Sequence, residues 1–356
     1  MKILVISLAG IGDTLFATPL IHELRANFPD ATIDVLTKEA GARDLLESNP
    51  HLNRVFYKNL LRCSRLATLR FLGSLRRERY ELSINTHPQS RIHYRIAAFV
   101  AGARTRLSHE YECFGWVDRR LVNVTLPQDY SRHAADNNLS LLPLINARQR
   151  LPAHALEIFL TPAEQTWADD FLEQNRLAGK PWLGIHVGSG GTKNLAQRRW
   201  PLENFIALAG RLRRNHPELG ILFFGGPEEK ADHEQIRSQL TDVIFPSTKN
   251  LRQAAALIGK CAAFLSVDTA LMNIAAAMQA RGQIIIETPT WNKPVEPYAN
   301  PFTLVKNPAV AGRNLEFYRY DGGHIKATRE ELQRCMASVT VDAVQAAVEN
   351  ALAGNS

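Results

Sequence analysis

Short apolar runs alternate with helical patterns through the first 100 residues of the chain. The expected strands are continuous apolar or β-branched runs, whereas the expected helices repeat their apolar positions every three or four residues. The strands are Lys2–Ser7, Ala31–Leu36, Arg54–Tyr57 and Glu81–Asn85, and the helices are Leu15–Asn27, Ala40–Ser48, Arg65–Arg79 and Ser90–Val100. Pro19 requires the first helix to begin near Thr18 or to bend there. This βαβα order predicts a parallel sheet with helices on both faces.

The alternation fades between about residues 127 and 152 and then begins again. The strands of the second half are Trp182–His186, Gly220–Phe224, Val243–Phe245, Ala263–Ser266 and Gln283–Ile286, and the helices are Pro162–Asn175, Leu202–Asn215, Lys230–Leu240, Leu251–Lys260 and Ala270–Gln279. The pattern indicates two doubly wound α/β halves with a linker near residues 150–180. A last helical stretch covers Arg329–Ala353, and its expected buried positions are Leu332, Val339, Val344 and Val348. We expect domains over residues 1–160 and 176–328 and a helical segment over 329–356.

Composition indicates a folded protein with an anionic partner. The chain has 356 residues, of which 45% are hydrophobic and 22% charged, so we expect two ordinary domains rather than disorder. The formal net charge of +7 favours nucleic acid, a phosphorylated substrate or an anionic membrane surface as partner. The four cysteines lie far apart and form no CxxC pair, so we expect no zinc or disulfide framework and a reducing cytoplasm. The apolar start is too short for a signal peptide, and no apolar run reaches about 18 residues.

A glycine-rich loop, SLAGIGDTLFATP, follows the first expected strand. In this loop Asp13 stands where a nucleotide-binding loop would present an amide or a cation. A carboxylate here can be the N-cap of the first helix or can act as an acid or base, and the residues alone favour neither. The loop lacks GxGxxG, which disfavours a nicotinamide-dependent oxidoreductase.

A second glycine loop, GIHVGSGGTKNLAQRRWP, lies between a strand and a helix in the second half. Residues 188–191 can present several backbone N–H groups to one anion, and Lys193, Arg198 and Arg199 lie nearby. Amides at a helix N-terminus together with cations are what a diphosphate requires. The loop is not a Walker A sequence. A plain flexible loop is the alternative, and the small residues with the cations favour anion binding.

Two further strand ends carry polar residues. In FFGGPEE, Glu228 can accept hydrogen bonds from a ribose diol or can favour a helix dipole, and the two roles have equal weight. In FLSVDTALMN, Asp268 and Thr269 stand where helix caps belong. A cap leaves other N–H groups of the helix free, so capping and ligand binding are compatible.

Three stretches spread over nearly the whole chain carry a family resemblance. They are the opening GIGDTLFATPLIHELRANFPDATIDVL, the central KNLAQRRWPLENFIALAGRL with ILFFGGPEE, and the late SVDTALMNIAAAM with ETPT. Together they resemble glycosyltransferase family 9, the heptosyltransferases that build the inner core of lipopolysaccharide. The resemblance implies a GT-B fold, in which two Rossmann-like domains face a cleft. It also implies that residues 1–160 bind the acceptor and residues 176–328 bind the nucleotide of ADP-heptose.

The resemblance also implies an inverting transfer that needs no metal and no cofactor besides the donor substrate. It makes Asp13, the acid of the GD motif, the general base, while Gly10 and Gly12 leave room beside the sugar. The residue two before WP is usually a phosphate-binding lysine and here is Arg198. The late motif usually reads D-[ST]-G-x-x-H, and here Ala270 and Asn273 replace the glycine and the histidine. The implied donor-binding residues are Gly188, Ser189, Gly190, Lys193, Arg198, Glu228, Asp268, Thr269 and Asn273.

A basic segment over residues 62–79 has only Glu78 and Glu81 nearby to balance it; its arginines are Arg62, Arg65, Arg70, Arg76, Arg77 and Arg79. A solvated helix face is the usual meaning of such a run. A phosphate-rich acceptor such as Kdo-bearing lipid A, or docking on the anionic inner leaflet, also accounts for it. The residues expected to bind the acceptor are Gly12, Arg62, Arg65 and Arg120.

Other functions are compatible with parts of the sequence. A transferase of the same family with another donor sugar or a protein acceptor is one, and a non-catalytic nucleotide- or glycan-binding relative is another. The intact Asp13 argues against the second. The arginines are not interleaved with aromatic residues and no nucleic-acid motif is present, so we expect no nucleic-acid partner. We expect a cytoplasmic enzyme with peripheral contact at the inner membrane.

Overall fold

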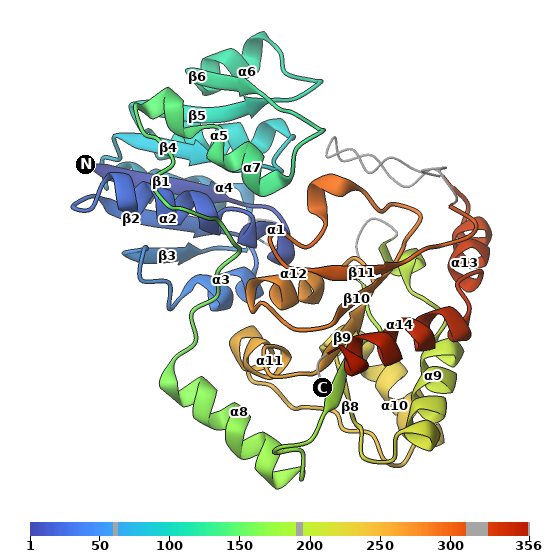
Figure 1. The fold of residues 1–356 in the computed structure, drawn as a ribbon. Coiled ribbons are helices and arrows are strands. Elements are labelled where there is room, and N and C mark those ends of the chain that lie inside the picture. Colours follow the sequence, from blue (N-terminus) through green and yellow to red (C-terminus); the bar gives the residue numbers. More distant parts are fainter. Residues whose placement is uncertain (60–62, 190–194, 311–326, 355–356) are drawn as a thin grey trace. The chain divides into compact units, whose positions relative to one another are not determined.

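The structure, a computed structural model, describes residues 1–59, 63–189, 195–310 and 327–354. These residues form two compact units (Figure 1). The first comprises Met1–Phe159 together with the later segment Lys293–Tyr298, and the second comprises Leu160–Asn292 and the remaining described residues. Each unit contains one sheet whose strands all run parallel.

The strands of the first sheet lie in the order β3-β2-β1-β4-β5-β6. Their bounds are β1 (Lys2–Ser7), β2 (Thr32–Thr37), β3 (Arg54–Tyr57), β4 (Leu82–Asn85), β5 (Thr105–Glu110) and β6 (Val124–Pro127). Val5 of β1 pairs with Val35 on one side and Ile84 on the other. The central strand is therefore buried on both faces, which explains why β1 is continuously apolar.

Helices cover both faces of the first sheet. They are α1 (Ile11–Leu15), α2 (Thr18–Asn27), α3 (Ala40–Leu46), α4 (Arg65–Arg76), α5 (Ile92–Ala101), α6 (Trp116–Leu121) and α7 (Ala134–Leu139), followed by the 3₁₀ helix η1 (Leu142–Ile145). Alternate residues of β1 serve two separate cores, as the two-residue period of a strand requires. Val5 packs in one core with Leu20 of α2, whereas Ile6 packs in the other with Leu72 of α4 and Ala97 of α5.

The strands of the second sheet lie in the order β11-β10-β9-β7-β8. Their bounds are β7 (Trp182–His186), β8 (Gly220–Phe224), β9 (Ala263–Ser266), β10 (Gln283–Ile286) and β11 (Phe302–Val305). The helices are α8 (Pro162–Gln174), η2 (Leu195–Arg198), α9 (Leu202–Asn215), η3 (Pro227–Glu229), α10 (Lys230–Gln239), α11 (Leu251–Ile258), α12 (Ala270–Ala277), α13 (Arg329–Ala337) and α14 (Val341–Ala353). One core joins Ile185 of β7 to Phe205 of α9 and Val348 of α14. The last helices therefore complete the core of the second unit.

The later segment Lys293–Tyr298 returns from the second unit to the first and contains the 3₁₀ helix η4 (Lys293–Val295). It lies against α7, because His133 Nε2 is 2.9 Å from the carbonyl oxygen of Glu296. The His133 ring also stacks on the ring of Tyr298. The first unit is thus assembled from two stretches of chain that are far apart in the sequence.

Several predicted elements differ from the structure. The helix expected over Leu15–Asn27 begins at Thr18, one of the two alternatives that Pro19 allows, and Leu15 instead ends the separate short helix α1. Arg329–Ala353 is likewise two helices, and Thr340 caps the second through the N–H of Ala343. Of the expected strand at residues 243–245, only a bridge between Leu222 and Ile244 is present. The buried positions Leu332, Val339, Val344 and Val348 are confirmed.

None of the helices formed by the described residues combines the length and the apolar character needed to cross a membrane.

Acidification is expected to destabilise the first unit through its buried histidines. Burial lowers the pKa of His109 to about 4, so below pH 6.5 the unfolded chain binds a proton at this residue that the folded chain does not. The free energy of unfolding then falls by about 1.4 kcal/mol per pH unit for this one group between pH 6.5 and 4. Urea titrations at several pH values measure this slope. His109→Phe should reduce it, whereas a change at the surface residue His216 should leave it unchanged.

Candidate active site

Each sheet has a point where the chain reverses the direction in which strands are added. In the first unit this point lies between β1 and β4, and in the second it lies between β7 and β9. In open parallel sheets, ligands bind beyond the carboxyl ends of the strands at such a point. The loops after β1 and β4 hold Asp13 and Arg91, and the loops after β7 and β9 hold Ser189 and Asp268. The topology therefore brings predicted site residues to both positions.

Asp13 lies in the first turn of α1. Gly10 is the N-cap, and Asp13 Oδ2 accepts the Gly10 N–H at 3.2 Å. The alternative that Asp13 is itself the N-cap is wrong, although its carboxylate does satisfy a backbone donor at the helix start. A Cβ on Gly10 would lie 3.1 Å from Asp13 Oδ2, so the glycine lets the carboxylate fold back over the loop. Gly12 is buried within α1.

Gln89 ties the two loops at this switch point together. Its Oε1 accepts the Leu8 N–H at 3.3 Å, and its Nε2 donates to the carbonyl oxygens of Ile6 and Thr86. Asn138 of α7 holds the same region by accepting the His87 N–H at 2.6 Å. The loop that carries Asp13 is thus fixed by buried side chains from distant parts of the chain, which preorganises a site.

The start of α5 contributes charge close to Asp13. Burial raises the pKa of Tyr94, while the Arg91 guanidinium lowers it and the carboxylates of Asp13 and Glu39 raise it further. Arg91 and Tyr94 were not among the residues predicted for the site. The sequence carried one usable signal, their position just after a buried strand, but the order of strands in the sheet was not predictable from it.

Of the residues expected to bind the acceptor, Gly12 is adjacent to Asp13 in α1, whereas Arg65 and Arg120 lie on other helices. Arg65 is exposed in the first turn of α4 and Arg120 is exposed in α6, where its guanidinium lies 5.2 Å from the Trp116 ring. α4 covers a face of the sheet and α6 packs on α5, whereas Asp13 lies beyond the end of β1. Arg62 lies outside the described residues.

In the second unit, the ends of β7 and β9 are joined by side chains. His186 Nδ1 is 3.2 Å from Thr269 Oγ1, and Thr269 also caps α12 by accepting the Met272 N–H at 3.4 Å. Burial lowers the pKa of His186 to about 3, with the charges of Arg199 and His233 acting in the same direction. His186 is therefore neutral at physiological pH and positions Thr269 without adding charge.

Arg198 is the buried cation of this cluster. Its Nη1 forms an ion pair with Asp268 and donates to Thr290 Oγ1 at 3.0 Å. Its Nε is buried with no hydrogen-bond partner among the described residues, and the same is true of Asn273 Oδ1. Buried polar atoms are nearly always paired, so these two atoms indicate where a ligand or water would bind.

A second network shapes the loop after β7. Arg199 donates to the carbonyl oxygen of Ser189 and to Glu229 Oε1, both at 3.1 Å, and to Asp232 at 2.8 Å. Glu229 in turn accepts the Gly226 N–H at 2.9 Å. The buried acid here is therefore Glu229, which was not predicted, whereas the predicted Glu228 is exposed. Gly190 and Lys193 lie outside the described residues.

A cavity of about 450 Å³ in the second unit lies on another side of this network, between the start of α9 and α13. Its lining includes Gln197, Arg199, Trp200, Asp232 and Arg334, but not Arg198, Thr269 or Asn273. The unpartnered atoms of Arg198 and Asn273 therefore do not belong to this cavity.

Gly188→Ala is expected to destabilise the second unit, because a Cβ at this position would lie 2.2 Å from Glu229 Oε1. Glu229 is held by Arg199 and by the Gly226 N–H, so it cannot move away without losing these bonds. We expect the free energy of unfolding to fall by about 1–3 kcal/mol. Gly73→Ala is the matched control, since no atom lies within 4 Å of its Cβ and alanine favours the helix. Equal stability of the two variants would contradict the packing argument.

The fold is the GT-B fold of glycosyltransferases. A family 9 glycosyltransferase from Veillonella parvula superposes with a TM-score of 0.78 and 18% identity over 99% of this chain and 97% of that one. Escherichia coli ADP-heptose lipopolysaccharide heptosyltransferase II superposes with a TM-score of 0.73 and 20% identity over 99% of both chains. At these identities the likeness establishes the architecture, and the expected fold class is confirmed.

The sequence profile of glycosyltransferase family 9 (heptosyltransferase) matches residues 68–316. The chain belongs to this family and is a glycosyltransferase. Lipooligosaccharide heptosyltransferase 2 of Haemophilus influenzae is 26% identical over 86% of this chain and 88% of its own length. Lipopolysaccharide heptosyltransferase 2 of Escherichia coli is 27% identical over 78% of this chain and 80% of its own.

Proposed function

We propose that the protein transfers heptose from ADP-heptose to the inner core of lipopolysaccharide, with inversion at the anomeric carbon. The observation that carries this proposal is that, in a chain of this family, the first unit has a carboxylate at its switch point and the second has a buried arginine ion pair at its own. The curated relatives are named as heptosyltransferases of lipopolysaccharide or lipooligosaccharide. A solved structure of the same fold holds ADP-2-deoxy-2-fluoro heptose.

The proposed reaction is a single displacement. Asp13 accepts the proton of the acceptor hydroxyl while that oxygen attacks the anomeric carbon of the heptose. The bond from this carbon to the diphosphate oxygen breaks, and ADP leaves with the electron pair. One displacement on the face opposite the leaving group inverts the configuration. Gly10 keeps the Asp13 carboxylate in place through its N–H, which leaves Asp13 able to accept further hydrogen bonds.

The donor diphosphate is proposed to bind at the loops after β7 and β9. Arg198 supplies positive charge to the leaving ADP, so that the transfer needs no metal. Asn273 Oδ1 and Arg198 Nε, which lack partners among the described residues, would gain them from the donor. Asp268 holds Arg198 through their ion pair, and Thr269 caps α12, the helix that carries Asn273. Gly188, Ser189, Gly190, Lys193 and Glu228 complete the proposed donor site.

Release of ADP tests the function directly. The purified protein is given ADP-heptose with lipid A acceptors that carry Kdo alone or Kdo with one heptose, and the products are identified by mass spectrometry. Transfer to either acceptor supports the proposal and identifies the acceptor sugar. A folded protein that binds ADP but transfers to neither acceptor would contradict it. A panel of other sugar nucleotides and protein acceptors would then test the alternative of another donor or acceptor.

We also propose that the layer formed by α4, α5 and α6 contacts an anionic membrane surface, where a lipid acceptor is found. α4 packs on α5, and α5 packs on α6. Among the described residues, every exposed large hydrophobic side chain other than Met1 lies on these helices: Leu66, Leu69, Ile92, Ile96, Phe99, Trp116 and Val117. The exposed arginines of the same helices and of the residue before α5 are Arg65, Arg70, Arg76, Arg91, Arg119 and Arg120. Apolar side chains surrounded by arginines favour the interface of an anionic bilayer.

Binding to vesicles that contain phosphatidylglycerol is expected to depend on this layer. Phe99→Ser with Trp116→Ser should weaken binding about tenfold or more, since both side chains are exposed, at 46% and 70%. Added salt should weaken it further, because the arginines contribute about 1 kcal/mol each near such a surface. Flotation assays measure the bound fraction. Arg65→Gln with Arg120→Gln should also weaken binding, because two of these arginines are lost. Arg281→Gln, in the second unit, is the control and should not weaken it. Equal binding to zwitterionic vesicles would contradict the proposal.

A further inference from the structure

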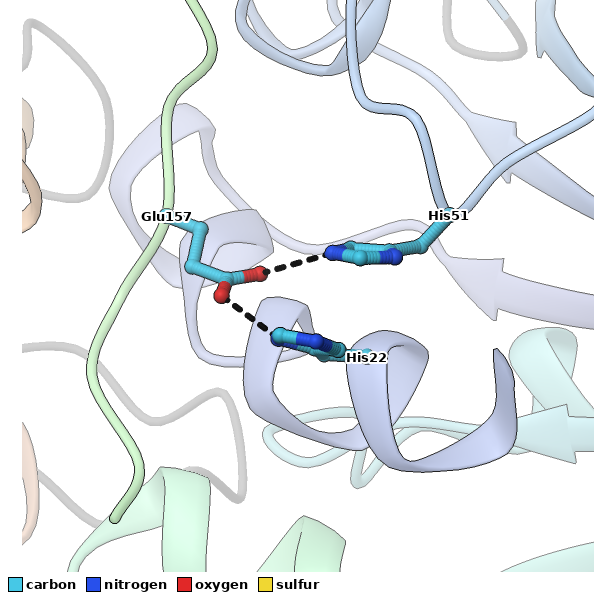
Figure 2. A group of neighbouring side chains, drawn as sticks. All are labelled: His22, His51 and Glu157. Atoms are coloured by element: carbon cyan, nitrogen blue, oxygen red, sulfur yellow. Dashed lines mark hydrogen bonds and ion pairs between the residues drawn. The ribbon is translucent and has the colours of Figure 1, made fainter. Parts of the chain in front are cut away.

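Three side chains of the first unit converge outside the proposed active site. His22 lies on α2, His51 follows α3, and Glu157 lies in the segment that leads out of the unit. Their ligand atoms all lie within 4.8 Å of one another (Figure 2). No metal-binding motif marks this cluster in the sequence, because His22 and His51 are 29 positions apart and Glu157 is more than 100 positions from either.

The geometry of this cluster centres on the carboxylate. His22 Nδ1 is 2.7 Å from Glu157 Oε1, and His51 Nε2 is 3.9 Å from Glu157 Oε2. The two imidazole rings stack with their centroids 3.8 Å apart and their planes 17° apart. Figure 2 shows the two carboxylate oxygens directed at the two rings, one toward each. Two nitrogens and a carboxylate thus face one small volume.

The cluster lacks the cation that a half-buried carboxylate normally has. Among the described residues, Glu157 forms ion pairs only with these two histidines, and its Oε2 is buried without a hydrogen-bond partner. Burial raises the pKa of Glu157, whereas the nearby His22 lowers it. Burial also lowers the pKa of His51 to about 4, and the charges of His22 and Arg25 act in the same direction.

We propose that His22, His51 and Glu157 bind one divalent transition-metal ion, and that zinc fits best. Two imidazole nitrogens with one carboxylate oxygen are a known zinc ligand set, with water in the fourth position. In a tetrahedral site with metal–ligand distances of about 2.0–2.2 Å, neighbouring donor atoms lie about 3.3–3.6 Å apart. The three ligand atoms lie within 4.8 Å of one another, so side-chain movements of about 1 Å bring them to these separations. The ion takes the place of the proton shared by His22 and Glu157.

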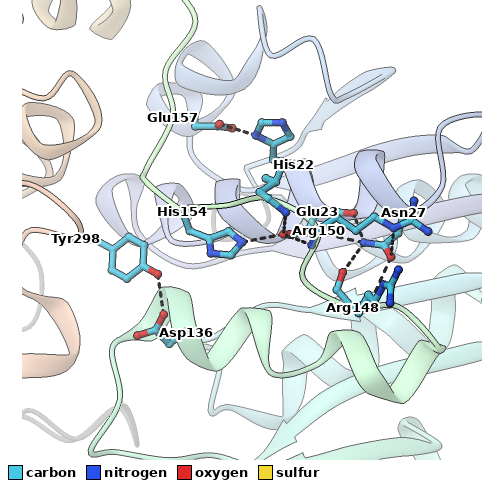
Figure 3. A network of polar contacts seen from close by, with 10 residues as sticks. His22, Glu23, Asn27, Asp136, Arg148, Arg150, His154, Glu157 and Tyr298 are labelled. Atoms are coloured by element: carbon cyan, nitrogen blue, oxygen red, sulfur yellow. Dashed lines mark hydrogen bonds and ion pairs between the residues drawn. The ribbon is translucent and has the colours of Figure 1, made fainter.

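The ion would act on the structure of the first unit rather than on the transfer step. The segment containing Glu157 is already attached to α2, because the Glu157 N–H donates to Thr18 Oγ1 at 3.0 Å. Earlier in the same segment, Glu23 of α2 accepts the N–H groups of Arg150 and Leu151 and pairs with His154 (Figure 3). A metal ion would add a third attachment, joining this segment to α2 and to the turn that holds His51.

Cobalt binding to the untagged full-length chain tests the proposal, since Co²⁺ reports zinc-type sites by its visible absorption. After treatment with a chelator, the chain should bind one Co²⁺, and Zn²⁺ should displace it. His22→Gln, His51→Gln and Glu157→Gln should each weaken binding about tenfold or more, while His216→Gln and His154→Gln should not. Zn²⁺ should raise the melting temperature of the parent chain but not of the His51→Gln variant.

The folding of each variant is first checked by circular dichroism. If the histidine variants fold poorly, Glu157→Gln is the variant to use, because its amide oxygen can still accept a hydrogen bond from His22. Metal affinity should also fall at lower pH, because protons compete for the same nitrogens. No binding, binding that none of the three substitutions weakens, or equal weakening by His216→Gln would each overturn the proposal. These measurements do not involve transfer activity, so they succeed or fail independently of the proposed function.

Discussion

Asp13→Asn is expected to lower the rate of heptose transfer by about 10²–10⁴-fold, the usual contribution of a general base. Asparagine has nearly the shape of aspartate, and its side-chain oxygen can still accept the Gly10 N–H that Asp13 accepts now. The first turn of α1 should therefore remain folded. The amide cannot take up a proton, so only the chemical step should be affected. Release of ADP at saturating donor and acceptor measures the change, and donor affinity should be unchanged.

Glu331→Gln is the matched control for this variant. Glu331 is also the third residue of a helix, α13, and accepts the N–H of Thr328 at 2.7 Å as Asp13 accepts that of Gly10. It is exposed and lies in the second unit, and the substitution should change neither rate nor affinity. If Asp13→Asn loses activity only in proportion to a loss of folded protein, then Asp13 stabilises the start of α1 and is not the general base.

Arg198→Ala is expected to lower kcat/KM by about 10²–10³-fold, the effect of removing one preorganised donor from a developing negative charge. Arg198 is only 7% exposed, and its unpartnered Nε lies in the cluster where we propose that the diphosphate binds. Affinity for ADP should fall as well. Arg198→Lys should recover part of the loss, because lysine keeps the charge but not the planar set of donors.

The control for Arg198 is Arg213→Ala. Arg213 donates two hydrogen bonds as well, but to the backbone carbonyls of Pro217 and Leu219, at 2.9 and 2.8 Å, beyond the end of α9. It should affect stability alone. Asp268→Asn tests whether Arg198 acts on the donor or only neutralises the charge of Asp268. If Arg198 matters only because it neutralises Asp268, then Asp268→Asn with Arg198→Ala should restore ADP affinity, and the proposed contact with the donor is wrong.

Much of the fold could be predicted because its central strands are apolar without interruption. β1 and β9 match their predicted bounds, since both are central strands buried on both faces. β5 was missed because it buries polar residues, Ser108 and His109, that a hydrophobic pattern counts as exposed. The break before α14 was missed because the apolar positions keep their spacing across it. α14 begins there with Thr340 as its N-cap, a local interaction that the hydrophobic pattern does not show.

Candidate site residues could be predicted where they lie in the segments that connect a predicted strand to a predicted helix. Asp13, Arg198 and Asp268 follow or precede predicted strands, and the parallel topology brings the last two into contact. Glu229 was missed because it and Glu228 are adjacent acids, and only the structure shows which is buried beside Arg199. Arg91 was missed because nothing in a single sequence indicates that β4 lies next to β1. Pairings of this kind are set by the sheet as a whole.

The return of Lys293–Tyr298 to the first unit limits how this enzyme can be recombined with its relatives. Tyr298 donates to Asp136 at 2.7 Å, and His133 contacts Glu296, so α7 has its partners late in the chain (Figure 3). A chimera joined at residue 159 would set one parent's α7 against the other parent's segment. Donor and acceptor specificities should therefore exchange cleanly only in hybrids that carry Lys293–Tyr298 together with residues 1–159. Insertion of the foreign segment alone should destabilise the first unit while the second keeps its own melting behaviour.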